Sequence, residues 1–401
     1  MNQSVVIKLI KWGVLPALLL LSAISCRKPF DPAVTNINVN YLVVEGVING
    51  GPDSTVINLS RTTTINSANT IVAERNAVVT VLSNAGDKYT LTENMPGAYS
   101  YNGLNLPASK TYCLHIITSN GEQYQSAFMA DEQTPAIDSV NYTVQGSGLQ
   151  FNVSTHDNTN NTRYYRWDYD ETWSYYSLLN SVIYYKNQQV KARPPDSLIN
   201  ACYEHATPSN SIFVSTSNHL SRDVINHFPL GYVAASTGKI TDVYSLLVKQ
   251  YAITADAYTY WTLLQQNTEQ LGTIFAPQPS SIPGNIQCIN NPAEPVIGFI
   301  SVSTIASKRV FVIGNLLPFN VPGYVPPPTP AQCQPDTVLF APTFTYNQRL
   351  SDVFATGTND PVRIAYYPGT DLAIGIMYAA PECVDCRVLG GTNVKPSYWP
   401  Q

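Results

Sequence analysis

Apolar and polar side chains alternate in short runs along most of the chain, and residues that favour turns separate the runs. Such alternation is typical of β-strands with one buried face, because successive side chains point to opposite sides of a sheet. About seven short strands within about 90 residues is typical of an immunoglobulin-like sandwich. We therefore predict a sandwich over residues 39–130. Its expected strands are residues 39–48, 54–61, 76–82, 88–91, 98–101, 110–118 and 123–129.

A second, larger β-rich domain is predicted over residues 136–401, after the polar break at residues 131–135. Its clearest strand spans residues 164–176, in which aromatic and charged residues alternate. We expect the aromatic face to fill the core and the charged face to be solvated. The aromatic face comprises Tyr165, Trp167, Tyr169, Trp173 and Tyr175, and the charged face comprises Arg166, Asp168 and Asp170.

Two helices are expected within the second domain. A weak one is predicted near residues 221–228, with Ser221 as its N-cap. A stronger one follows Thr254 and ends before Gly272, because apolar residues recur at helical spacing and one face buries Trp261. The predicted fold class is therefore mainly β, with an N-terminal sandwich and a larger domain that contains two or more inserted helices. Long proline-rich loops, of the kind that often bind ligands, are expected at residues 277–295 and 314–330.

The first 25 residues have the features of a signal peptide. Two lysines precede an apolar run at residues 12–24, which is shorter than the roughly 20 residues that a membrane-spanning helix needs. Small residues then precede Cys26, which resembles the lipobox where bacterial signal peptidases cleave before a lipidated cysteine. We predict a lipoprotein signal peptide over residues 1–25, lipid attachment to Cys26 and a tether over residues 26–38. Ordinary secretory cleavage with Cys26 unmodified is the alternative.

Composition narrows the class of protein further. Hydrophobic residues make up 44% of the 401 residues, which excludes a chain that is disordered throughout. The formal net charge of −5 argues against a nucleic-acid partner, since binding to phosphates requires a basic surface.

The chain has seven cysteines. If Cys26 carries lipid, six remain in an exported protein, where disulfides form and persist. Cys113 is expected to be a buried free thiol within its strand, because cysteine packs as a small apolar residue. The closely spaced pair near the C-terminus is expected to be structural, either as a local disulfide or as two separate bridges. The candidate disulfide residues are Cys202, Cys288, Cys333, Cys383 and Cys386.

The sequence contains no phosphate-binding glycine loop, no zinc-helix motif and no nucleophile elbow. Asp168 and Asp170, with Glu171 beside them, could place two carboxylates about 7 Å apart, a spacing that overlaps the range for glycoside hydrolysis. Carboxylates that alternate with core aromatic residues usually form a solvated strand face. We therefore predict no catalytic residue and no enzymatic activity.

Two further segments contain residue types that ligate metals or act as nucleophiles. Residues 202–205 combine a thiol, a carboxylate and an imidazole, but a cysteine in an exported protein is more often in a disulfide. Residues 157–161 offer several oxygens, yet they lack the turn glycine of a calcium loop. We therefore predict no metal ion and no cofactor. The histidines, which have no ligand-like spacing, are His115, His156, His205, His219 and His227.

The second domain also contains several distinctive short segments. They are SLLVKQY at residues 245–251, YW at 260–261, NTEQLG at 267–272, PQP at 277–279, GNIQC at 284–288, CVDCR at 383–387 and GGTN at 390–393. Together with FDP at residues 30–32, these segments resemble the Bacteroidota lipoproteins catalogued as domain of unknown function 4249. The resemblance covers nearly the whole mature chain. It implies an outer-membrane lipoprotein, commonly encoded beside a TonB-dependent transporter, with no established activity.

The resemblance and the missing catalytic motifs favour a non-catalytic, lipid-anchored subunit that helps a TonB-dependent transporter to capture or gate its ligand. One alternative is an adhesion or envelope-scaffolding lipoprotein whose sandwich binds another protein. A less favoured alternative is a surface glycan hydrolase that uses Asp168 or Asp170. The expected location is the outer membrane. Whether the protein faces the cell surface or the periplasm stays open, because Arg27 and Lys28 stand where a surface-export signal would place acidic residues.

Overall fold

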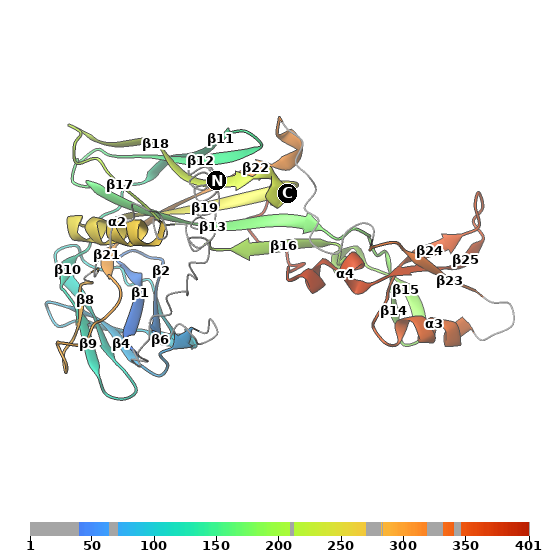
Figure 1. Cartoon of the computed structure of the whole chain (residues 1–401), viewed down its shortest axis with the longest axis horizontal. Helices are drawn as coiled ribbons and strands as arrows, with labels where there is room; N and C mark the ends of the chain where they lie inside the picture. Colours follow the sequence, from blue (N-terminus) through green and yellow to red (C-terminus); the bar gives the residue numbers. More distant parts are fainter. Residues whose placement is uncertain are drawn as a thin grey trace, which may run out of the picture. The chain divides into compact units, whose positions relative to one another are not determined.

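The computed structural model of the chain is mainly β, as predicted (Figure 1). The predicted signal peptide, Cys26 and the tether lie outside the residues that it describes. Within the described ranges, no helix is both long enough and apolar enough to cross a membrane. The described residues are 40–63, 71–208, 212–269, 282, 284–318, 332–340 and 346–400.

The N-terminal sandwich consists of two sheets that share one hydrophobic core. The strand orders are β21-β1-β2-β7-β6 and β20-β9-β8-β4-β5. Alternate residues of each strand face the core, so Ile57 of one sheet and Val81 of the other are both fully buried. The strands are β1 Leu42–Asn49, β2 Ser54–Arg61, β3 Val72–Ala73, β4 Val78–Ser83, β5 Lys88–Thr90, β6 Thr92–Met95, β7 Ala98–Asn102, β8 Thr111–Ile117, β9 Gln123–Ser126, β10 Met129–Ala130, β20 Ile286–Cys288 and β21 Ser301–Ser303.

Two strands of this sandwich come from the region that the sequence prediction placed in the second domain. Strand β21 runs parallel to β1, and β20 pairs antiparallel with β9. Figure 1 shows the orange strand β21 beside the blue strand β1. The predicted range 39–130 omits both strands, because a hydrophobic pattern shows which face of a strand is buried and not which distant strand pairs with it.

Two glycines allow the segment before β21 to lie close to β1 and to the segment before β20. Gly298 has a φ of +130°, and a Cβ there would lie 2.1 Å from the carbonyl oxygen of Val44. A Cβ on Gly284 would lie 2.0 Å from the carbonyl oxygen of Gly298. Only residues without a Cβ fit such a close approach of backbones.

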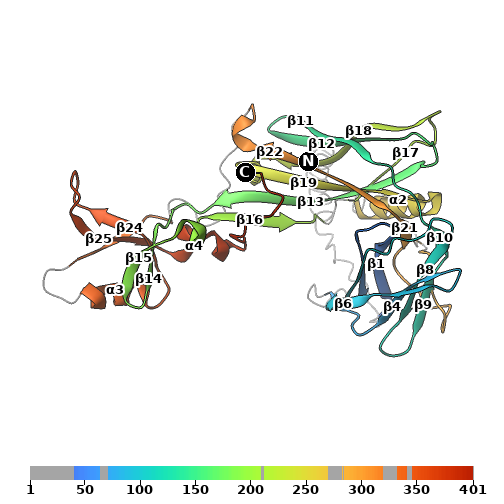
Figure 2. The ribbon, with the colours of Figure 1, turned by 180° about the vertical axis from the view of Figure 1, so that it is seen from behind.

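Two further sheets enclose the core of the second domain. One has the order β11-β12-β18, and it covers the sheet β16-β13-β19-β22 (Figure 2). The aromatic face of β13 lies in this core, as predicted, and the fully buried rings of Tyr165 and Trp167 stack on each other. The strands are β11 Ile137–Val144, β12 Gly148–Asp157, β13 Tyr164–Tyr176, β16 Ala201–Ala206, β17 Phe213–Thr216, β18 Asp223–Ala234, β19 Val243–Ala252 and β22 Ile305–Ile313.

One of the two predicted helices is present and the other is a strand. Helix α2 spans Ala255–Glu269, and the hydroxyl of Thr254 accepts a hydrogen bond from the backbone N–H of Ala257. The helix predicted at residues 221–228 is wrong, because this segment begins strand β18 and pairs with β12. Asp223 is buried there and accepts hydrogen bonds from the hydroxyls of Tyr165 and Ser217, so tertiary contacts outweigh a weak capping signal.

The C-terminal part adds a small sheet of order β23-β25-β24, a separate β14–β15 hairpin and short helices. Its elements are β14 Ile183–Lys186, β15 Gln189–Ala192, β23 Asp336–Leu339, α3 Tyr346–Phe354, β24 Asp360–Tyr366, β25 Ala373–Ala379 and α4 Pro381–Val384, with 3-10 turns at Pro195–Ser197 and Cys386–Leu389. Two further 3-10 turns, Ala235–Thr237 and Gly314–Leu316, follow β18 and β22.

Two disulfides fix the C-terminal tail. They join Cys202 to Cys386 and Cys333 to Cys383, so the closely spaced cysteine pair belongs to two separate bridges. Cys288, a candidate for a disulfide, is instead a buried free thiol, because its strand β20 packs inside the sandwich. Cys113 is also buried and free, as expected from its position in β8.

Candidate functional site

A cleft of about 670 Å³ lies between the sandwich and the β13–β19 face of the second domain. We call it the charged cleft. Strands β1 and β2 line one wall, and the charged face of β13 together with residues of β19 lines the other. Its volume falls in the range of small-molecule sites. The charged and aromatic residues that line it are Glu45, Asp53, Arg166, Asp168, Asp170, Lys249 and Tyr251.

Arg166 lies on the face that was predicted to be solvated, but its side chain is only 9% exposed. Its guanidinium lies over the rings of Tyr251 and Trp261, at 4.4 and 4.7 Å from the ring centroids. It also donates a hydrogen bond of 2.9 Å to Asp168. The prediction of a solvated face was wrong at this residue, because α2, which carries Trp261, packs on β13. Stacking on two rings therefore holds the cation in place.

Asp170 forms the second ion pair of the charged cleft. Its carboxylate lies 2.6 Å from the ammonium of Lys249 and accepts a hydrogen bond of 2.5 Å from Thr207. Burial raises the pKa of Asp170, but the hydrogen bonds from Lys249 and Thr207 outweigh it, so the pKa lies below its ordinary value. The carboxylate is therefore charged at neutral pH.

The structure does not bring the three predicted carboxylates together. Asp168 and Asp170 both line the charged cleft, whereas Glu171 lies on the opposite face of β13 with only 3% exposure. There Glu171 accepts a hydrogen bond from Tyr244 and pairs with Lys239. A general acid for glycoside hydrolysis needs a raised pKa, and the pKa of Asp170 is lowered. The arrangement suits the binding of a polar group more than proton transfer.

Acidic groups outnumber basic groups in the charged cleft. Asp168 and Asp170 are each matched with a cation, whereas Glu45 and Asp53 are exposed and make no ion pair within the described chain. Unmatched carboxylates attract cations and hydrogen-bond donors and repel anions.

The other candidate segments do not assemble into a site. Cys202 is in a disulfide, so it supplies no thiol to His205. The carboxylate of Asp157 accepts hydrogen bonds from the backbone N–H groups of Thr159, Asn161 and Thr162. Burial raises the pKa of Asp157, but these bonds outweigh it and lower the pKa to about 2. Its oxygens are thus used within the loop, and the described residues contain no group of three potential metal ligands.

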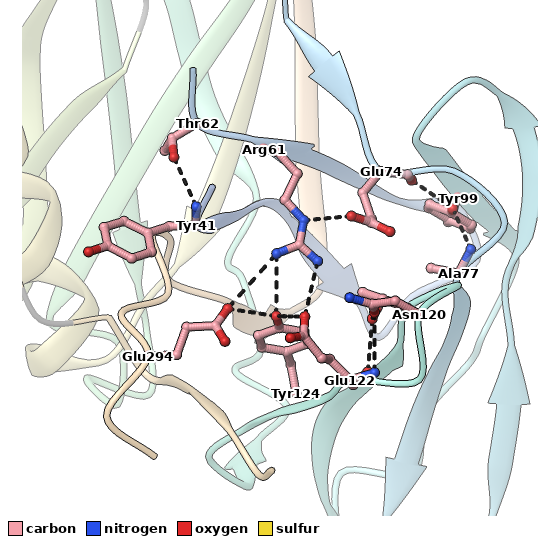
Figure 3. Close-up of polar contacts among 11 residues, drawn as sticks. Tyr41, Arg61, Thr62, Glu74, Ala77, Tyr99, Asn120, Glu122, Tyr124 and Glu294 are labelled. Carbon is pink, nitrogen blue, oxygen red and sulfur yellow. Dashed lines mark hydrogen bonds and ion pairs between the residues drawn. The ribbon is translucent and has the colours of Figure 1, made fainter. Parts of the chain in front are cut away.

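A buried arginine network in the sandwich was not predicted from the sequence (Figure 3). Arg61 at the end of β2 lies 2.6 Å from Glu74, 3.6 Å from Glu122 and 3.9 Å from Glu294. The hydroxyl of Tyr124 lies 2.7 Å from Glu294 and 2.9 Å from Glu122. Burial alone would lower the pKa of Arg61, but the hydrogen bonds to Glu74 and Tyr124 outweigh this effect, so the pKa is raised. The network fastens the segment after β20 to β2, so its role is structural.

A family model described as a domain of unknown function, DUF4249, matches residues 27–309, which is more than half of the chain. The chain belongs to the DUF4249 family. The DUF4249 match includes the sandwich, α2 and both walls of the charged cleft. It ends within β22, so the DUF4249 region does not include the sheet of β23, β24 and β25.

No curated protein matches the chain in sequence. A proposed carbohydrate-binding protein from Bacteroides uniformis ATCC 8492 is 10% identical, with 53% of this chain and 90% of that chain covered and a TM-score of 0.13. CBD12 from CALX1.2 is 11% identical, with 68% and 99% covered and a TM-score of 0.16. Scores this low support no argument about function.

Proposed function

We propose that this DUF4249 protein is a non-catalytic, ligand-binding lipoprotein and that the charged cleft is its binding site. The observation that carries the proposal is the arrangement of charges in the cleft. Arg166 and Lys249 are held by ion pairs, and the unmatched Glu45 and Asp53 stand on the facing wall. Such preorganised polar groups bind a ligand without first having to be ordered, which lowers the cost of association.

A direct test uses the protein purified from native membranes. Native mass spectrometry should detect a bound small molecule, and titration of the identified molecule into apo protein should give its Kd. The double variant E45Q and D53N should weaken binding about tenfold or more, since each lost charge interaction contributes about 1 kcal/mol. The matched control is D371N, which removes a carboxylate from the exposed turn between β24 and β25.

Two outcomes would contradict this proposal. Equal affinities for the double variant and the wild type would exclude the charged cleft as the site. Conversion of the bound molecule to a product by the wild type would exclude a non-catalytic role.

We further propose that the protein is anchored in the outer membrane through Cys26 and passes its ligand to a TonB-dependent transporter. The support is the lipobox-like sequence before Cys26 and the resemblance to lipoproteins encoded beside such transporters. Detergent-solubilised outer membranes with native expression of both proteins should yield a complex. Recovery of this protein free of any transporter would rule out the partnership.

A further inference from the structure

A second pocket, of about 650 Å³, lies where helix α2 faces strand β10 and Phe299, which precedes β21. We call it the aromatic pocket. The rings of Tyr260 and Phe299 are both about 7% exposed, and their centroids lie 5.2 Å apart at an angle of 37°. Phe128, Met129 and Leu263 complete its apolar lining. The volume and the aromatic lining are typical of a small-molecule site.

Two carboxylates also line the aromatic pocket, those of Glu132 and Asp256, and none of the lining residues that the structure describes is basic. The backbone of Glu132 pairs with Val302 and Thr304 in the sheet. Its side chain makes no hydrogen bond or ion pair within the described chain, while burial raises its pKa. A partly desolvated carboxylate without a partner is unfavourable unless another group supplies the positive charge.

The combination of aromatic rings and carboxylates selects for one chemical class of ligand. Aromatic faces attract an ammonium group within about 6 Å, and a carboxylate strengthens this attraction. The apolar lining of Met129 and Leu263 would bury an attached hydrocarbon chain, at about 25 cal/mol per Å². Anions would be repelled by Glu132 and Asp256, and neutral alcohols would bring no positive charge to either carboxylate.

We propose that the aromatic pocket binds an organic cation that consists of an ammonium head group on a short apolar chain. This site is independent of the charged cleft, because the two pockets share no lining residue. An apolar cluster that includes Val47, Tyr251 and Tyr260 lies between the sandwich and the second domain and contributes residues to both pockets.

Isothermal titration of the full mature protein tests the proposal with three probes of equal chain length. Hexyltrimethylammonium should bind, whereas hexanol should bind at least tenfold more weakly and hexanoate should not bind. The E132Q variant should weaken binding of hexyltrimethylammonium at least tenfold. F299L keeps an apolar side chain but removes one ring, and it should weaken binding several-fold. Unchanged melting temperatures would show that the variants are folded.

A variant outside both pockets serves as the control. The D371N variant should leave binding of hexyltrimethylammonium unchanged, because Asp371 is exposed and lines neither pocket. The proposal is overturned if the wild type does not bind the cation, if hexanoate binds as tightly, or if both E132Q and D256N bind like the wild type. A loss of binding in D371N equal to that in E132Q would also overturn it.

Discussion

Asp131 is a buried carboxylate with few compensating contacts. It lies at the end of the sandwich, 6% exposed, where a Cβ on Gly50 would be within 2.3 Å of both its oxygens. The amide of Gln133 donates to one oxygen at 2.8 Å, and the other oxygen has no hydrogen-bond partner within the described residues. Burial therefore raises the pKa of Asp131 to about 6.

This pKa predicts that the contribution of Asp131 to the stability of the fold decreases as the pH rises. The folded chain keeps a proton on Asp131 that the unfolded chain releases near pH 4, so stability falls between about pH 4 and 6 and is constant above. The raised pKa corresponds to a loss of at most about 3 kcal/mol over the whole range. Urea unfolding at pH 4.5 and 7 should show about two-thirds of this loss in the wild type and little of it in D131N.

Burial also raises the pKa of Glu132. The stability of D131N should therefore still fall with rising pH, but with a smaller slope than that of the wild type. An unchanged slope in D131N would show that Asp131 is not the group responsible.

Arg166 shows what could and could not be predicted at the scale of single residues. Alternation along β13 placed it correctly on the face opposite Trp167. Its burial depends on Trp261, a residue nearly 100 positions away, which no local pattern can bring near. The pairing of Asp170 with Lys249 likewise depends on the register between β13 and β19. Sequence thus identified two carboxylates of the candidate site but neither their partners nor the facing wall.

At the scale of elements, local sequence patterns predicted α2 correctly but missed β18. Helix α2 was predicted because a capping threonine and helical spacing agree within one local segment. Strand β18 was missed because its pairing with β12, across about 70 residues, decides its conformation. The parallel pairing of β21 with β1 could likewise not be read from either segment.

The contact between the segment before β21 and strand β1 gives a test at this scale. G298A should destabilise the protein by about 3 kcal/mol, because the added Cβ would meet the carbonyl of Val44 and the φ of +130° would be strained. The control G369A has a positive φ but open space around its Cβ, so it should cost only about 1 kcal/mol. Urea unfolding measures both. Equal losses would mean that the close approach does not matter.

At the scale of the whole molecule, two disulfides join cysteines that lie far apart in the sequence. Cys202 and Cys386 are 184 residues apart, and Cys333 and Cys383 are 50 apart. Chain entropy predicts that each bridge stabilises the fold by about 4 to 5 kcal/mol, slightly more for the longer loop. The paired variants C202A/C386A and C333A/C383A should both unfold at lower urea concentration than the wild type. Unfolding of both at the wild-type midpoint would contradict a stabilising role.

The proposed membrane attachment concerns the entire chain and depends on Cys26. The variant C26S should move the protein from the detergent phase to the aqueous phase in a partition assay, because lipidation requires the thiol. A control such as C113S should stay in the detergent phase, since Cys113 is buried within the sandwich. Retention of C26S in the detergent phase would contradict lipidation.

If the chain is exported as proposed, the completion of the sandwich by β20 and β21 affects the order in which the protein folds. A chain crosses a membrane from its N-terminus, so β1 and β9 emerge long before their partners at residues 286–303. Until then both strands have an unpaired edge, which is a template for association with other chains. Chaperones would have to cover these edges while about 160 further residues emerge after β9 and about 250 after β1.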